Sequence, residues 1–358
     1  MEASQREAAY RAWYRWEQPA AYRLPAPTPS PWQEEQHLAA IADIDDALGT
    51  SPTADEAHDL NALRRALIGA VLQETAAQTP GSLLDARAAL ATRLGYEHAL
   101  ALVTAVYVLD VTTVLALATQ LLDSSHDLFV SARAELTVTG DGLVGGHDRS
   151  VAIEPATDAP PTSLFVTTDA GELRLGRDRD AYHQALAAVG QAVMRRCDGG
   201  HPEALVGAVG AALATALAGT PAWLDAALRM AEPERSQHAR TEAFATLRAS
   251  RIDAALTLAL AAAGEPDAPE RLATLLSRAL GEPVTPTAAA TMLETLTLDE
   301  APVRLSASAI AAGMAAGNPE WWTGVAAQRP WCDPTSYDLA PGALLRHIAE
   351  RILTVPPT

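Results

Sequence analysis

The stretch from Ala99 to Leu122 constrains the fold more than any other part of the chain, because it is almost unbroken apolar sequence. A single acid, Asp110, lies near its middle. When the stretch is arranged as a helix, its few polar residues scatter around the circumference, so no face is reserved for water. The pattern therefore predicts a core helix that is buried on all sides and surrounded by the rest of the chain.

Two other interpretations of this stretch stay open. It is longer than the ~20 residues that a transmembrane helix needs, but the central acid and the lack of flanking arginine clusters or aromatic belts disfavour a membrane span. Alternatively, Val103 to Val108 form a strand and Asp110 caps a helix that begins at Val111. If Asp110 is buried, it must be paired with an arginine, hydrogen-bonded as a cap or protonated, because an isolated buried carboxylate is costly.

Composition favours a helical protein and removes several functional classes. The apolar share of 49% comes mainly from Ala, Leu and Val, and such small side chains let helices approach closely. The chain contains no Lys, which excludes Schiff-base and lysine-nucleophile enzymes and the lysine of phosphate-binding loops. A net charge of −18 opposes binding to nucleic acid. The same charge favours solubility and can attract a basic partner.

The order of patterns along the chain predicts a mainly α protein, either a multi-helix bundle or an irregular helical array, with a small antiparallel β insertion. The expected helices include 33–48, one that begins at Thr53, 82–95, 234–248, 252–263, 270–280, 286–296 and 341–353. The insertion is a predicted meander of short β-type runs at 129–130, 136–138, 151–153, 164–167 and 173–175. The predicted divisions are an arm at 1–24, a linker at 25–31, helical body at 32–126, the β insertion at 127–179 and helical body at 180–358.

Aromatic residues are concentrated near both ends of the chain. A short predicted helix near the N-terminus carries Tyr10, Trp13, Tyr14 and Trp16. The first three share a face that either the protein's own body or a partner must cover. The Pro-rich linker that follows cannot continue a helix, so we expect this helix to be an arm. Trp321 and Trp322 belong to a Pro-containing segment that either plugs the end of the helical body or lines a ligand or partner pocket.

One short acidic motif suggests a specific chemistry. Residues Asp43, Ile44, Asp45 and Asp46 spell DIDD, which resembles the DxDD acid motif of class II terpene cyclases. The resemblance implies an all-helical enzyme in which the middle aspartate protonates an alkene or epoxide. Closely spaced carboxylates suit this chemistry, because one of them stays protonated near neutral pH. The alternative is that these acids continue the solvated face of the helix predicted over 33–48.

The sequence predicts no cofactor and no metal site. Cys197 and His201 have the spacing of two zinc ligands, but no second closely spaced pair completes a site. The chain lacks the G-x-S-x-G, G-x-G-x-x-G and H-E-x-x-H motifs of common enzyme classes. Two cysteines cannot build a disulfide framework and no secretion signal opens the chain, so we expect a cytoplasmic protein.

These observations favour an interaction or accessory protein that binds another protein through its aromatic arm, its acidic surface or its β insertion. The alternative is an enzyme with a pocket between helices, in which Asp110, Asp45 or Asp46 serves as acid or base. The two hypotheses differ in their consequences. A binding protein should tolerate the loss of each isolated carboxylate and lose function without residues 1–24, whereas an enzyme should behave in the opposite way.

Overall fold

The structure of the chain is a computed structural model. It describes residues 31–76, 83–138, 165–174, 203–317 and 341–353, apart from short gaps at 51, 169–170, 229–230, 233 and 296–297, and isolated positions between 186 and 194. The predicted arm with Tyr10, Trp13, Tyr14 and Trp16 lies outside the described residues, as do Trp321 and Trp322.

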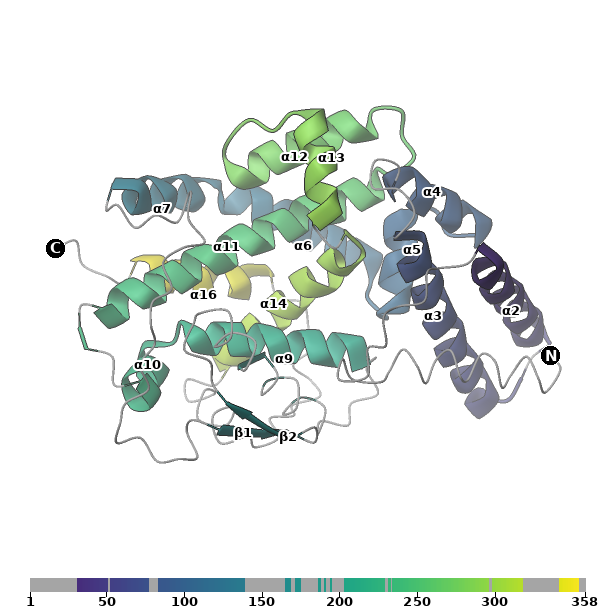
Figure 1. The fold of residues 1–358 in the computed structure, drawn as a ribbon, viewed down its shortest axis with the longest axis horizontal. Helices are drawn as coiled ribbons and strands as arrows, with labels where there is room; N and C mark the ends of the chain where they lie inside the picture. The colour runs from purple at the N-terminus through teal and green to yellow at the C-terminus, as the bar shows by residue number, and fades with distance from the viewer. Residues whose placement is uncertain are drawn as a thin grey trace.

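The described residues are mainly helical, which confirms the mainly α part of the predicted fold class (Figure 1). The first half forms α2 (Pro31–Gly49), α3 (Ala54–Ala76), α4 (Leu83–Arg93), α5 (Ala99–Val106), α6 (Val111–Ser124) and α7 (His126–Val138). The second half forms α9 (Glu203–Ala218), α10 (Pro221–Leu228), α11 (Glu234–Ala261), α12 (Ala268–Leu280), α13 (Pro286–Thr295), α14 (Ala301–Gly317) and α16 (Pro341–Leu353), with a short 3-10 helix, η4 (Leu298–Glu300), before α14.

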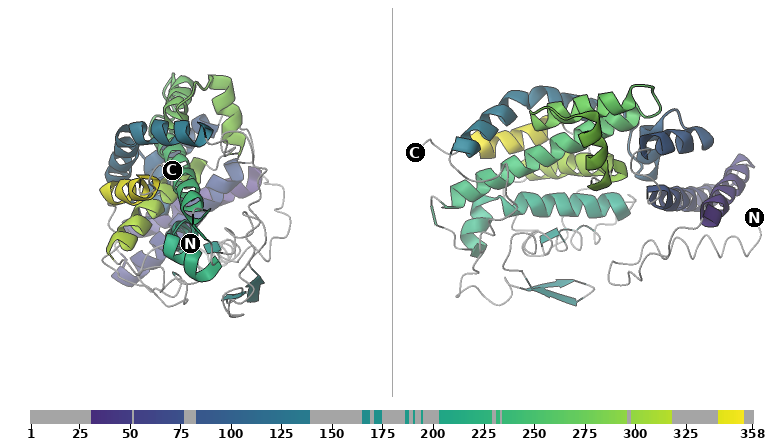
Figure 2. Two further views of the ribbon diagram at one scale, coloured as in Figure 1. Left: turned by 90° about the vertical axis from the view of Figure 1, so that its left-hand side faces the viewer. Right: turned by 45° about the horizontal axis from the view of Figure 1, so that its top comes forward.

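Helix α11 is the central element of the fold. It packs against α5, α6 and α7 from the first half of the chain and against α9, α12, α14 and α16 from the second half. In Figures 1 and 2 it runs through the middle of the molecule, while α2, α3 and α4 lie together at one end. The two separate helices predicted over 234–248 and 252–263 are therefore wrong. Nothing between them breaks a helix, because Ala249, Ser250 and Arg251 include neither Gly nor Pro.

The predicted single helix over 99–122 is also wrong, because the stretch divides into α5 and α6, which meet at an angle of 109°. The N–H of Leu109 donates to the carbonyl of Thr104 at 2.9 Å, and the N–H of Val108 donates to that of Ala105 at 3.4 Å. This is the Schellman arrangement that ends many helices, and it requires a left-handed residue that is usually Gly. Here Val108 takes that position with φ +56° and is 57% exposed.

The buried core forms two clusters that meet near this turn. The larger cluster contains Leu100, Val103, Leu117 and Leu121 from α5 and α6, so most of the apolar stretch is in the core as predicted. The smaller cluster is built around α9 and also includes apolar residues of α14. Tyr107 packs against both clusters. The α5–α6 turn therefore connects the two parts of the core.

Arg251 of α11 is completely buried and joins the C-terminal ends of two other helices. Its guanidinium donates to the carbonyls of Leu122 near the end of α6 and of Ala279 and Arg278 near the end of α12, and to the Ser125 hydroxyl. The guanidinium also stacks 4.7 Å from the ring centre of Phe129. Burial lowers the pKa of Arg251 to about 10, so the side chain stays charged at neutral pH. Carbonyls at helix C-termini carry partial negative charge, which compensates this cation.

The predicted β meander is not supported. Its first two runs, at 129–130 and 136–138, belong to α7, whose Phe129 stacks on Phe244 of α11 with ring centroids 5.3 Å apart. This packing against α11 overrides the local β preference of the sequence. The described strands are β1 (Phe165–Thr168) and β2 (Gly171–Arg174), which pair as one antiparallel hairpin with Val166 opposite Leu173. The run at 151–153 lies outside the described residues.

Within the described ranges, no single helix is long and apolar enough to cross a membrane. The bent pair α5 and α6 reaches that length and composition only when the two helices are taken together.

Candidate functional site

The structure places Asp110 on the surface, so its predicted burial inside the core is wrong. Its carboxylate caps α6, accepting hydrogen bonds from the backbone N–H of Thr113 at 2.7 Å and from the Thr113 hydroxyl. These two hydrogen bonds lower the pKa of Asp110. The capping role is one of the predicted alternatives, but the element before it is the helix α5 and not a strand. A surface carboxylate with a lowered pKa is poorly suited to act as an acid.

The DIDD residues lie on α2, where Ile44 is buried and Asp45 and Asp46 are exposed. The Asp45 carboxylate is held by Arg64 of α3, with Nε–Oδ1 and Nη2–Oδ2 distances of 2.5 and 3.1 Å. The same guanidinium donates to the hydroxyl of Tyr96 at 2.5 Å. The middle aspartate of the motif is therefore held at the surface in a two-point ion pair with arginine, and not in an enclosed acid site.

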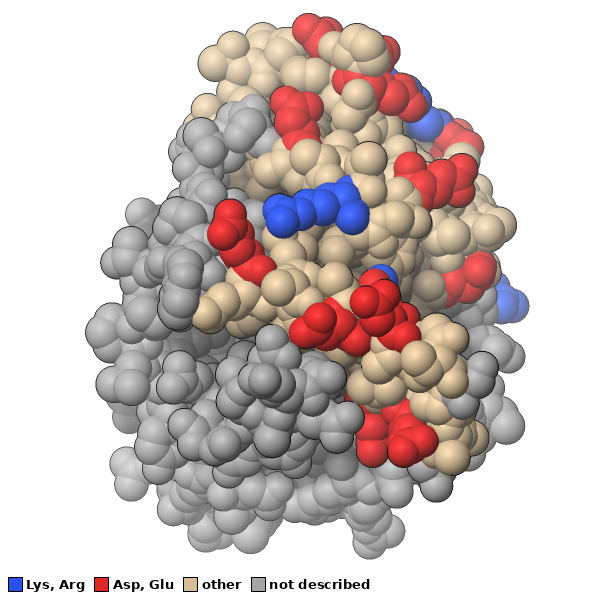
Figure 3. Space-filling model, turned by 90° about the vertical axis from the view of Figure 1, so that its right-hand side faces the viewer, with Lys and Arg blue, Asp and Glu red and all other residues tan. Residues whose placement is uncertain are grey.

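The helices at this end of the molecule present an acidic surface. We call it the α2–α4 face, and its exposed acids are Glu35, Asp45, Asp46, Glu56, Asp59, Asp85 and Glu97. Among the described residues from 35 to 98, Arg93 is exposed while the other arginines are buried or half-buried. Figure 3 shows this side of the molecule, with carboxylates spread over the described surface and few basic side chains. The exposed carboxylates of this face therefore outnumber its exposed arginines.

A second feature is a cavity of about 240 Å³ between four helices, here called the inter-helix cavity. Each helix contributes one stripe of residues, and eight of the seventeen lining residues are Ala. The lining residues are Ala208, Ala211, Ala212, Thr215 and Ala216 from α9, Ala243, Thr246, Ala249, Ser250 and Asp253 from α11, Arg304, Ser308, Ala311 and Ala312 from α14, and Leu344, His347 and Ile348 from α16. Ala249 is exposed, so the cavity is open to solvent on that side.

Asp253 and Arg304 are the charged pair in the wall of this cavity. The Asp253 side chain is 10% exposed and receives Arg304 Nη2 at 2.5 Å on Oδ1. Arg304 Nε lies 3.1 and 3.2 Å from the two carboxylate oxygens, and Arg304 Nη1 donates to Glu300 at 3.1 Å. Burial raises the pKa of Asp253, while the hydrogen bonds from Arg304 act in the opposite direction. One guanidinium therefore serves two carboxylates.

Tyr107 lies close to this group of charges. Its pKa is raised, first by burial and then by the negative charges of Glu300 and Asp299. The phenol therefore stays protonated at all physiological pH values.

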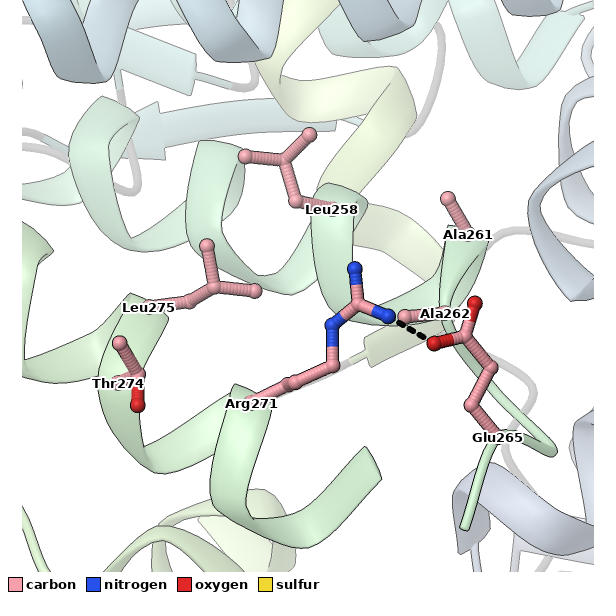
Figure 4. Close-up of a pocket in the computed structure, with 7 residues that line it drawn as sticks. All are labelled: Leu258, Ala261, Ala262, Glu265, Arg271, Thr274 and Leu275. Atoms are coloured by element: carbon pink, nitrogen blue, oxygen red, sulfur yellow. Dashed lines mark hydrogen bonds and ion pairs between the residues drawn. The ribbon is translucent and has the colours of Figure 1, made fainter. Parts of the chain in front are cut away.

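Another cavity, of about 370 Å³, is an open depression between the end of α11 and α12. Figure 4 shows Arg271 and Glu265 paired across it, with Leu258 and Leu275 on its apolar side. Both members of this ion pair are about half exposed. Exposed ion pairs of this kind contribute little energy and offer no enclosed reaction site.

Neither of these cavities is lined by Asp110, Asp45 or Asp46, and sequence analysis did not single out Asp253 or Arg304. A signal for them does exist, since each is a lone charge in an otherwise apolar helical run, at 252–263 and 301–313. Asp110 is also a lone charge in an apolar stretch. This pattern alone therefore does not distinguish a cavity residue from a helix cap.

In the part of the chain that the structure describes, no group of three or more His, Cys, Asp and Glu side chains is placed to hold a metal ion. Cys197 and His201 lie outside that part. Comparisons with models of protein families, with curated proteins and with solved structures find no match for this chain.

Proposed function

We propose that the protein binds another protein, and that the α2–α4 face recognises a basic segment of that partner. The observation that carries the proposal is the surplus of exposed carboxylates on this face, with Arg93 as its exposed cation. Complementary charge speeds encounter and selects basic over acidic partners. The predicted arm at 1–24 is a second contact in this proposal, while the β insertion no longer contributes to it.

Arg64 supports the treatment of these acids as one surface. It bonds Asp45 on α2 and Tyr96 in the α4–α5 connection, so the neighbouring exposed residues Asp46 and Glu97 belong to adjacent parts of the face. Because Asp45 is already neutralised by Arg64, the carboxylates that remain for a partner are those beside it. A test should therefore change Asp46 and Glu97 and leave Asp45 as it is.

The test uses a fluorescent arginine-rich peptide as the probe and measures its binding by fluorescence anisotropy. The triple variant Asp46→Asn, Asp59→Asn, Glu97→Gln should weaken binding about tenfold at low salt, and the effect should shrink as salt screens the charges. The matched control is Asp127→Asn, Asp267→Asn, Glu270→Gln, which removes equal charge from exposed positions on α7 and at the start of α12.

Equal weakening by the two triple variants would show a general charge effect and overturn the proposal. Deleting residues 1–24 in the same assay measures the contribution of the arm, which should weaken binding further if its aromatic residues contact the partner.

The alternative, an enzyme that uses Asp110 or the DIDD acids, gains less support from the geometry. Asp110 is an exposed helix cap and Asp45 is an ion-paired surface residue. If this alternative is correct, Asp45→Asn should abolish an isomerisation or cyclisation of an isoprenoid substrate while leaving the fold intact. We expect instead that Asp45→Asn changes stability by less than ~0.5 kcal/mol.

A further inference from the structure

The inter-helix cavity plays no part in binding through the α2–α4 face, and its chemistry points to a separate function. It has the volume of about eight water molecules. An apolar core of Ala and Leu would normally close such a space, because unfilled volume reduces stability. Here the wall instead carries a buried carboxylate, Asp253, beside the hydroxyls of Ser250 and Ser308. Polar groups in an apolar wall are typical of small-molecule sites.

Three of the seven polar side chains that line the cavity act as acceptors toward a bound molecule, namely Thr215, Thr246 and Asp253, whereas Arg304 and His347 carry donors and Ser250 and Ser308 can do either. Thr215 and Thr246 donate their hydroxyl hydrogens to carbonyls of their own helices, at 3.0 and 2.8 Å. Toward a molecule in the cavity these two oxygens can therefore only accept. On Asp253, Oδ1 receives both short contacts from Arg304, whereas Oδ2 receives Nε at 3.2 Å. A carboxylate oxygen has room for two donors, so Oδ2 can accept another.

The charged side chains beside the cavity also favour a ligand that carries a positive charge. Arg304 is shared between Asp253 and Glu300, so these three side chains together carry one surplus negative charge, and the imidazole of His347 is the other titratable group among the lining residues. A second cation close to Asp253 would complete the balance, and burial would strengthen that attraction. The remaining wall, formed by Ala side chains with Leu344 and Ile348, is suited to an apolar body.

From these features we propose that the inter-helix cavity binds a small primary amine, with its ammonium group on Asp253 and a short apolar body along the Ala-lined wall. The ammonium group of the ligand donates to Asp253 Oδ2. This site is independent of the α2–α4 face, so either proposal can fail without the other.

The test is isothermal titration calorimetry on the full chain with three probes of similar shape: 2-phenylethylamine, 2-phenylethanol and 3-phenylpropionate. We expect the amine to bind at least about tenfold more tightly than the alcohol, because the bond to the carboxylate is charge-assisted. The carboxylate probe should not bind. Equal binding of amine and alcohol, or no binding of the amine, would overturn the proposal.

Two variants locate the site. Ala212→Leu fills the cavity from α9 and should abolish binding, while Ala245→Leu, at a half-buried position of α11 outside the cavity, should leave it unchanged. Asp253→Asn keeps the shape of the side chain and should remove the preference for amine over alcohol. If Asp253→Asn retains that preference, or if both leucine variants bind like the parent chain, the assignment to this cavity is wrong. Circular dichroism checks that each variant is folded.

Discussion

Two arginines, Arg251 within helix α11 and Arg304 beside it, are held in opposite ways. Arg251 points from α11 toward the ends of α6 and α12, and its donors are taken up by backbone carbonyls and the Ser125 hydroxyl. Arg304 reaches α11 from α14, and its partners are the carboxylates of Asp253 and Glu300. The first guanidinium is fully buried, whereas the second lies in the wall of a cavity.

Arg251 therefore belongs to a structural site, whereas Arg304 belongs to a site that a ligand can reach. Carbonyl groups do not titrate, and helix ends fix their positions, so Arg251 has one stable arrangement. Asp253 is a titratable group whose pKa is raised by burial, and it borders space that another molecule can enter. The two sites use residues only two positions apart on α11, but these positions face different neighbours.

The largest expected effect is at the structural site. Arg251→Met keeps much of the side-chain volume but removes every donor, which leaves the carbonyls of Leu122 and Ala279 buried without this partner. Unfolding in urea at pH 7 should show a loss of about 3 kcal/mol in the free energy of unfolding. A loss below ~1 kcal/mol would mean that the carbonyls find other donors, and the contrast with Arg304 would disappear.

A smaller effect is expected at the cavity. Asp253→Leu leaves the Arg304 guanidinium with one carboxylate fewer and should cost about 2 kcal/mol. The double variant Asp253→Leu, Arg304→Met removes both charges and should be less destabilised than the sum of the single variants. Urea denaturation of all three variants measures this coupling. Additive effects would show that the pair contributes no interaction of its own.

Sequence analysis recovers the elements that depend on local signals. Helix α16 has the predicted bounds 341–353, and α3 begins after Thr53, whose backbone N–H donates to the Glu56 carboxylate at 3.0 Å while its hydroxyl accepts from the Glu56 N–H. This capping box is visible in four consecutive residues. The DIDD acids are likewise on a helix surface, as one of the two interpretations expected.

What sequence analysis misses depends on long-range contacts. Asp253 meets Arg304 across 51 positions, and no local pattern specifies that pairing. The prediction of one helix over 99–122 lacks the bend after α5 because the left-handed position is Val108, where a sequence signal would be Gly. In α7, β-branched and aromatic residues suggested strands, but stacking of Phe129 on Phe244 favours the helix.

The α5–α6 turn lies at the opposite end of α6 from the residues that Arg251 binds. Val108→Gly removes the cost of a β-branched side chain at φ +56° and should stabilise the protein by about 1 kcal/mol. Thermal unfolding measures the gain. The matched change Val130→Gly, at another exposed valine within α7, should destabilise instead. A loss of stability in Val108→Gly would show that the valine side chain makes contacts that outweigh its strain.

The smallest effect is expected for Asp110→Ala, which removes the cap of α6. Because the pKa of Asp110 is lower in the folded chain, its carboxylate contributes stability above its unfolded pKa of about 4. That contribution disappears as the pH falls through the folded pKa. The melting temperature of the variant should therefore lie below that of the parent chain at pH 7 and approach it in acid. A constant difference at all pH values would exclude the charge as its cause.

The position of α11 in the chain also has a consequence for biosynthesis. Arg251 donates hydrogen bonds to Leu122 and Ser125, but it is synthesised 129 and 126 residues after them. Until α11 leaves the ribosome, the apolar faces of α5, α6 and α7 lack the surface that covers them. Such delayed closure slows folding and exposes nascent chains to aggregation. We expect the emerging first half to need chaperone protection, and a chain truncated before Glu234 to be recovered in the insoluble fraction.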